Sequence, residues 1–144
     1  MSISPELARI VAFFETMDRA ALANLGSIYT EEAAFKDPFN EVAGLAAIGA
    51  IYAHMFEQVS EPRFVIRERL QQNGEACLTW DLLFRMRRFQ PEITQVIHGA
   101  THLRLAEDGR IAAHRDYWDA AEELYEKLPV LGGLMRWLKT RARK

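Results

Sequence analysis

The 144-residue chain is long enough for one compact domain with a sizeable core, since 49% of its residues are hydrophobic. Its formal net charge of −2 gives no field that would attract nucleic acid, so no nucleic-acid partner is expected. The single cysteine, Cys77, excludes an internal disulfide. Neither a secretion signal nor a membrane-spanning run is seen, so we expect a cytoplasmic location and no membrane span.

The N-terminal part of the chain shows the spacing of helices. Ser4-Pro5 is typical of a helix start, with an N-cap serine and proline at the first helical position. Apolar residues then recur every three or four positions, which predicts a first helix. A second helix is predicted after Asp18, and a third over about 45–58.

A short strand is predicted between the second and third helices, over 33–36. It ends at Asp37-Pro38, because proline forces the residue before it into an extended conformation. From residue 63 onward the pattern alternates, which predicts an antiparallel meander whose first turn is Asn73-Gly74. The expected strands cover 63–72, 76–86, 94–105 and 111–118.

Helices segregated from an antiparallel sheet predict an α+β layered fold, and a strongly bent sheet leaves a concavity beside the helices. We expect this domain over residues 1–120. Residues 121–144 are expected to be a C-terminal tail, in which Leu131–Lys144 is amphipathic, basic and interrupted by Gly132-Gly133. The tail is expected to be helical and to pack on or beside the domain. Alternatives are a lid over the concavity or association with a membrane surface.

The last predicted strand carries an unusual set of side chains. Alternation places His114, Asp116 and Trp118 on one face, whereas a core strand normally presents only apolar groups there. His114 and Asp116 lie about 7 Å apart along the strand, so they could share a water or a substrate oxygen. Desolvation in an apolar pocket shifts a carboxyl group towards general acid–base work, and an imidazole can assist it. The structural alternative is that Asp116 pairs with an arginine and His114 is simply hydrogen-bonded.

The order of elements resembles the nuclear transport factor 2-like superfamily, and within it the SnoaL-like polyketide cyclase and ketosteroid isomerase group. Two segments carry the resemblance: Tyr29–Pro38, which ends in Asp-Pro, and Asp108–Asp119. The resemblance implies a cone-shaped curved antiparallel sheet wrapped around the N-terminal helices, the cystatin-like α+β barrel. It also implies an apolar pocket and a homodimer.

The resemblance to ketosteroid isomerases assigns roles residue by residue. Asp37 matches their catalytic base, but their enolate-binding Tyr and Asp fall on Phe13 and Thr101 here. Losing such a donor typically costs ~10²–10³ in rate, so steroid isomerisation as such is disfavoured. In SnoaL-like cyclases the acid/base is an Asp on the last strand, which Asp116 matches.

Limonene epoxide hydrolases share the run Arg115–Asp119, but they also need an Arg-x-Asp trio on an earlier strand. The nearest match, Thr79-Trp80-Asp81, lacks the arginine. His98 and His102 lie about 13 Å apart along a strand, too far to bind one metal ion, so we expect no metal site.

These residues support one leading hypothesis and two alternatives. The leading hypothesis is a cofactor-independent isomerase, cyclase or hydratase acting on an apolar, oxygen-bearing molecule of polyketide, steroid or terpenoid type. Asp116 is the expected acid/base, His114 assists, and Asp37 is a second candidate base. The alternatives are a non-catalytic ligand-binding or dimerisation domain and an epoxide hydrolase. The expected pocket walls are Phe13, Tyr52, Phe56, Trp80, Leu82, Phe84, Thr101 and Trp118.

Overall fold

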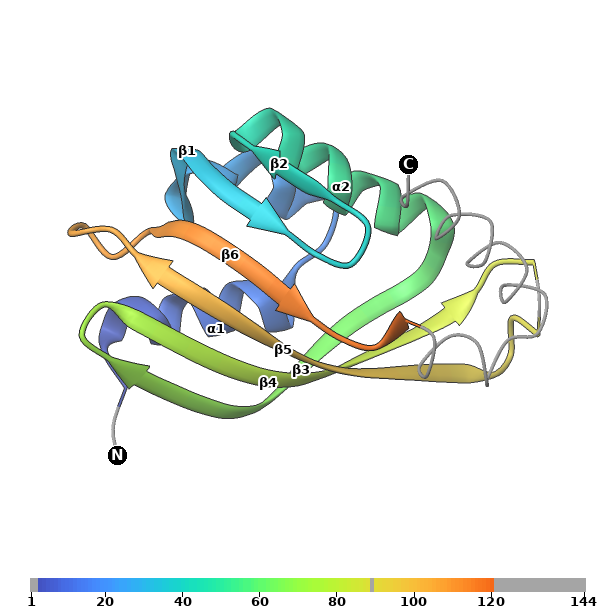
Figure 1. Ribbon diagram of the computed structural model, residues 1–144. Helices are drawn as coiled ribbons and strands as arrows, with labels where there is room; N and C mark the ends of the chain where they lie inside the picture. Colours follow the sequence, from blue (N-terminus) through green and yellow to red (C-terminus); the bar gives the residue numbers. More distant parts are fainter. Residues whose placement is uncertain (1–2, 89, 121–144) are drawn as a thin grey trace.

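The computed structural model describes residues 3–88 and 90–120, so the tail expected over 121–144 lies outside the described residues. The described part holds helices packed against one curved, unclosed sheet, and Figure 1 shows α1 behind the middle strands and α2 beside β1 and β2. The elements in order are α1 (Pro5–Thr16), the 3₁₀ helix η1 (Ala20–Ser27), β1 (Tyr29–Lys36), β2 (Glu41–Ala43), α2 (Leu45–Gln58), β3 (Val59–Gln72), β4 (Glu75–Met86), β5 (Thr94–Leu105) and β6 (Ile111–Tyr117). The α+β expectation is confirmed.

The sheet differs from the expectation in one respect, because it is mixed rather than wholly antiparallel. Its strand order is β2-β1-β6-β5-β4-β3, and β1 pairs with β6 in parallel while the other pairs are antiparallel. A parallel pair needs a long crossover, which the segment from β2 through β5 supplies. This pairing sets the first strand of the chain directly beside the strand that carries His114 and Asp116.

Local sequence signals explain where most elements begin and end. The Ser4 hydroxyl accepts from the Leu7 N–H at 3.2 Å, with proline at the first turn, so α1 begins as predicted. The β3–β4 hairpin turns at Asn73 and Gly74, both of which have positive φ. The second helix is a 3₁₀ segment with a kink at Asn24, rather than an α-helix.

One close approach within the sheet requires a glycine. Trp80 on β4 pairs with Gly99 on β5, and its buried indole lies over the glycine. A Cβ at residue 99 would collide with three carbons of the indole ring. Gly99 therefore lets the indole lie flat against β5 and extend towards Thr101, two residues along the strand.

Candidate functional site

His114 and Asp116 point into the concave side of the sheet from β6. The His114 side chain is 3% exposed and that of Asp116 is 17% exposed. The expectation of two groups bridged by a shared water or substrate oxygen needs refinement, because they contact each other directly. Nε2 of His114 lies 2.7 Å from Oδ1 of Asp116. Asp116 has no arginine partner here, so the expected structural pairing with an arginine does not form among the described residues.

Thr101 on β5 holds the same carboxylate oxygen from the other side. Its hydroxyl donates to Oδ1 of Asp116 at 2.6 Å, and its oxygen accepts from Nε1 of Trp80 at 2.7 Å. The cross-strand pairing of Thr101 with Asp116 produces this contact. Within the described residues, Oδ1 therefore accepts two hydrogen bonds while Oδ2 accepts none.

A pair of buried tyrosines lies on the opposite side of the imidazole. The Tyr29 hydroxyl on β1 is 2.7 Å from Nδ1 of His114 and 2.8 Å from the Tyr52 hydroxyl on α2. Burial, followed by the neighbouring hydroxyl of Tyr52, raises the pKa of Tyr29 well above its usual range. Burial, followed by the charge of Asp116, also raises the pKa of Tyr52. Both side chains therefore remain phenols that can donate hydrogen bonds.

Aromatic rings enclose the imidazole. The ring centroids of Phe35, Phe14 and Tyr29 lie 4.6, 5.7 and 5.8 Å from that of His114. These rings exclude water and restrict rotation of the imidazole. His114 is thus an internal group, and of His114 and Asp116 it is Asp116 that lines the open space described next.

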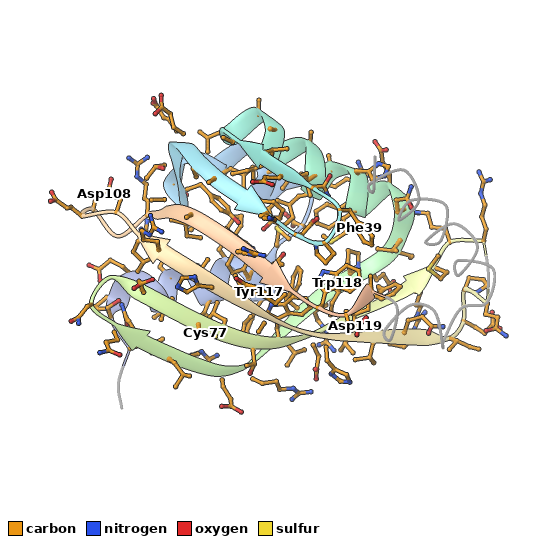
Figure 2. The ribbon with its side chains drawn as sticks, viewed as in Figure 1. Phe39, Cys77, Asp108, Tyr117, Trp118 and Asp119 are labelled. Carbon is orange, nitrogen blue, oxygen red and sulfur yellow. The ribbon has the colours of Figure 1, made fainter. Side chains whose placement is uncertain are left out.

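That open space is a cavity of about 790 Å³ at the end of β6. Phe39 and Trp118 form one wall, with ring centroids 5.6 Å apart and edge-to-face, and Figure 2 shows them side by side near Asp119. The described lining residues are Lys36, Asp37, Pro38, Phe39, Arg115, Asp116, Tyr117, Trp118, Asp119 and Ala120. The volume lies within the range of small-molecule sites.

Asp37 lines the same cavity but has a structural task. Its Oδ1 accepts from the backbone N–H groups of Phe39 at 2.8 Å and Asn40 at 2.7 Å. The Asn40 side chain also donates to both carboxylate oxygens. These contacts hold the turn after β1. A role for Asp37 as a base stays a prediction.

The other predicted pocket residues divide into two groups. Trp118 lines the cavity, while most of the others pack into the core. Tyr52, Phe56, Trp80, Phe84 and Thr101 are buried, and Phe13 and Leu82 are partly buried against the core. Trp80 and Thr101 act on the site through their hydrogen bonds to each other and to Asp116. The assignment of the rest as pocket walls stays a prediction.

The epoxide hydrolase constellation is not assembled in the structure. Asp81 lies on the outer face of β4, opposite to its buried neighbour Trp80. It binds Arg67 at 2.6 Å and also contacts His98. Asp81 and Asp116 therefore do not share a site. His102 is likewise on the outer face, paired with Glu75, and the described residues contain no cluster of three or more ligands for a metal ion.

Tyr29 is the site residue that the sequence pattern did not single out. Its contact with His114 bridges 85 positions and depends on the parallel pairing of β1 with β6. The sequence signal that could have identified Tyr29 is chemical, because a tyrosine buried in a core needs a hydrogen-bond partner for its hydroxyl.

The site thus lies on a curved sheet packed against helices, where a hydrogen-bonded carboxylate and imidazole lie beside a cavity. The family model of the SnoaL-like domain matches residues 10–114, so the chain belongs to the SnoaL-like domain family. No curated protein matches the chain. No helix in the described part is long and apolar enough to cross a membrane.

Solved structures agree on the fold. A candidate SnoaL-like polyketide cyclase from Shewanella putrefaciens CN-32 is 18% identical, with TM-score 0.73, covering 90% of this chain and 99% of that chain. A hypothetical protein from Catenulispora acidiphila with a ketosteroid isomerase-like fold, in complex with trimethylamine, is 13% identical with TM-score 0.72, covering 86% and 92%. TerC co-crystallized with polyporic acid is 15% identical with TM-score 0.68, covering 81% and 91%. At these identities the likeness shows the fold alone.

Proposed function

We propose that this SnoaL-like chain is a cofactor-independent acid–base enzyme acting on an apolar, oxygen-bearing small molecule of polyketide, steroid or terpenoid type. The observation that carries the proposal is the state of Asp116. One of its oxygens is held by hydrogen bonds to Thr101 and His114, while the residue lines a cavity with an aromatic wall. A carboxylate held in a defined orientation beside a ligand-sized space is suited to general base chemistry.

The simplest reaction is proton abstraction next to a carbonyl group. The carboxylate of Asp116 removes a proton from the carbon beside the carbonyl, becomes a carboxylic acid and leaves an enolate. The acid then returns a proton to that carbon or to a conjugated carbon, which regenerates the carboxylate. Lys36 and Arg115 are also among the residues that line the cavity, and positive charge there favours an enolate over the neutral ketone.

Proton exchange tests this role before the natural substrate is known. The full chain is incubated in D₂O with bicyclic and steroid ketones, and deuterium incorporation is followed by mass spectrometry. We expect Asp116→Asn to lower protein-dependent exchange by about 10²–10⁴-fold, the usual contribution of a general base. Asp108→Asn, in an exposed turn away from the cavity, is the control and should exchange like the unmodified chain.

Asp37 supplies the competing assignment within the same experiment. Because its carboxylate holds a turn, Asp37→Asn should lower exchange much less than Asp116→Asn does. The reverse order of losses would transfer the role of base to Asp37. No exchange above background with any ketone would remove the enzymatic proposal.

A non-catalytic ligand-binding domain is the second candidate, and a specific observation favours it. The Thr101 hydroxyl, at the position of an enolate donor in ketosteroid isomerases, already donates to Asp116. Binding without chemistry would appear as a change in tryptophan fluorescence with a hydroxyquinone such as polyporic acid. The ligand would then be recovered unchanged, and Trp118→Phe should reduce the fluorescence change because Trp118 lines the cavity.

A homodimer is also proposed from the family resemblance, and a cytoplasmic location because a single cysteine fits a reducing compartment. Sedimentation of the full chain at several concentrations tests the first. A monomer at every concentration would exclude the dimer.

A further inference from the structure

Six polar groups form one continuous chain across the interior of the domain. The order is Tyr52, Tyr29, His114, Asp116, Thr101 and Trp80, and each link is between 2.6 and 2.8 Å. The chain joins α2, β1, β6, β5 and β4. Every described buried side-chain nitrogen and oxygen has a hydrogen-bond partner, so the network is satisfied.

The chemistry of its members gives this chain a direction. Trp80 can only donate, so the Thr101 oxygen accepts from it and the Thr101 hydroxyl donates to Asp116. An ionised carboxylate only accepts, so Nε2 of His114 carries the hydrogen that points to Asp116. In a neutral imidazole Nδ1 is then the acceptor, so Tyr29 donates to it and accepts in turn from Tyr52.

We propose that Tyr29 is a positioning residue for Asp116: by donating to Nδ1 of His114 it holds the neutral ring as the Nε2–H tautomer. Oδ1 of Asp116 therefore stays an acceptor, and the proton that Asp116 takes from a ligand resides on Oδ2. This inference rests on the proposed function for its catalytic consequence, whereas the tautomer itself is a property of the folded chain.

The consequence concerns the return of the proton. A protonated carboxyl group could pass its proton through Oδ1 to Nε2 if the imidazole moved its own hydrogen to Nδ1. The proton would then be stored away from the cavity. The hydrogen bond that Tyr29 donates to Nδ1 opposes this transfer of the imidazole hydrogen to Nδ1. Burial and the hydrogen bond with Tyr52 hold the Tyr29 hydroxyl in place.

Nitrogen-15 spectra of histidine-labelled protein test the tautomer directly. The other three histidines have side chains between 46% and 67% exposed and serve as internal references. His114 should show a protonated Nε2 and an accepting Nδ1 in the full chain. A wild-type spectrum with hydrogen on Nδ1, in a neutral or a doubly protonated ring, would overturn the proposal at once.

Two variants separate the effect of Tyr29 from that of Asp116. In Asp116→Asn, Tyr29 should still hold a single Nε2–H tautomer. In the double variant Tyr29→Phe, Asp116→Asn, both tautomers should be populated. Equal tautomer mixtures in the two proteins, or a single Nε2–H tautomer in both, would show that Tyr29 does not determine the tautomer of His114.

Exchange kinetics then test the catalytic consequence. With the panel ketone that exchanges fastest, Tyr29→Phe should slow deuterium incorporation about tenfold, less than the ~10²–10⁴-fold effect of losing the base. Ligand affinity should stay unchanged. Tyr52→Phe should slow exchange less than Tyr29→Phe does, because it also removes a buried hydroxyl but retains the Tyr29 hydroxyl that donates to His114. An equal slowing in both variants would indicate a merely structural role.

The two failures are distinguishable. If the nitrogen-15 spectra show the expected tautomers but no ketone incorporates deuterium, the proposed function is wrong and the tautomer assignment stands. If exchange depends on Asp116 but not on Tyr29, the proposed function stands and the positioning role is wrong. Near-ultraviolet circular dichroism shows whether each variant is folded, and the wild-type spectrum tests the tautomer even when a variant does not fold.

Discussion

Replacing Thr101 with valine should destabilise the domain far more than replacing it with serine. The Thr101 hydroxyl makes two buried bonds, accepting from Trp80 at 2.7 Å and donating to Asp116 at 2.6 Å. Valine keeps the shape but removes both, so the indole N–H of Trp80, itself 5% exposed, is left without its partner. An unsatisfied buried donor costs about 1–3 kcal/mol, and a lost bond to a charged group about 1.5–3 kcal/mol.

The extra apolar group of valine offsets roughly 1 kcal/mol of that loss, so the free energy of unfolding should fall by about 2–4 kcal/mol. Serine keeps the hydroxyl and loses one methyl group, which costs about 1 kcal/mol. Urea unfolding measures the loss of unfolding free energy in both variants, with expected m-values of about 1–3 kcal/mol per molar. Equal midpoints for the valine and serine variants would refute the reasoning, because losing the Thr101 hydroxyl would then cost no more stability than losing its methyl group.

Two further predictions concern packing and pH. Gly99→Ala should lower stability by about 1–3 kcal/mol and change tryptophan fluorescence, because the new Cβ collides with the Trp80 ring. Gly26→Ala is the control in thermal unfolding, since its Cβ would meet Leu45 at an ordinary 3.5 Å. The hydrogen bond with His98, then that with Arg67, lowers the pKa of Asp81 below its ordinary 3.8. Its contribution to stability is therefore present above pH 3.8 and is lost as the pH falls through the lowered value. The stability gap between the unmodified chain and Asp81→Asn should close over that range, and a gap independent of pH would contradict the assignment.

Local sequence signals were sufficient for most of the fold. The range of α2, Leu45–Gln58, agrees with the prediction, because apolar spacing marks its buried face. The first strand begins at Tyr29 rather than at residue 33. The prediction missed its first residues because the exposed pair Glu31 and Glu32 interrupts the apolar pattern. The three-residue strand β2 was not predicted, and its pairing with β1 is what identifies it as a strand.

The site was predictable only where it lies on one strand. Alternation along β6 correctly places His114 and Asp116 on the same inward face. The partners Tyr29 and Thr101 come from strands that neighbour β6 only after folding. No periodicity in a single sequence encodes which strand lies beside which, because that choice depends on burying the whole sheet at once. Trp80 and Phe84 are buried among the core residues, and their assignment as pocket walls stays a prediction.

The position of Thr101 limits how an enolate could be stabilised here. A hydroxyl that already donates its one hydrogen to Asp116 cannot donate it to a substrate oxygen as well. If the chain catalyses enolisation, the cavity-lining cations Lys36 and Arg115 are the candidate source of stabilising charge. Stabilisation by partly exposed cations is screened by salt, whereas an interior donor would be insensitive to it. Deuterium exchange should therefore slow as ionic strength rises, and an exchange rate independent of salt would indicate a donor deeper in the site.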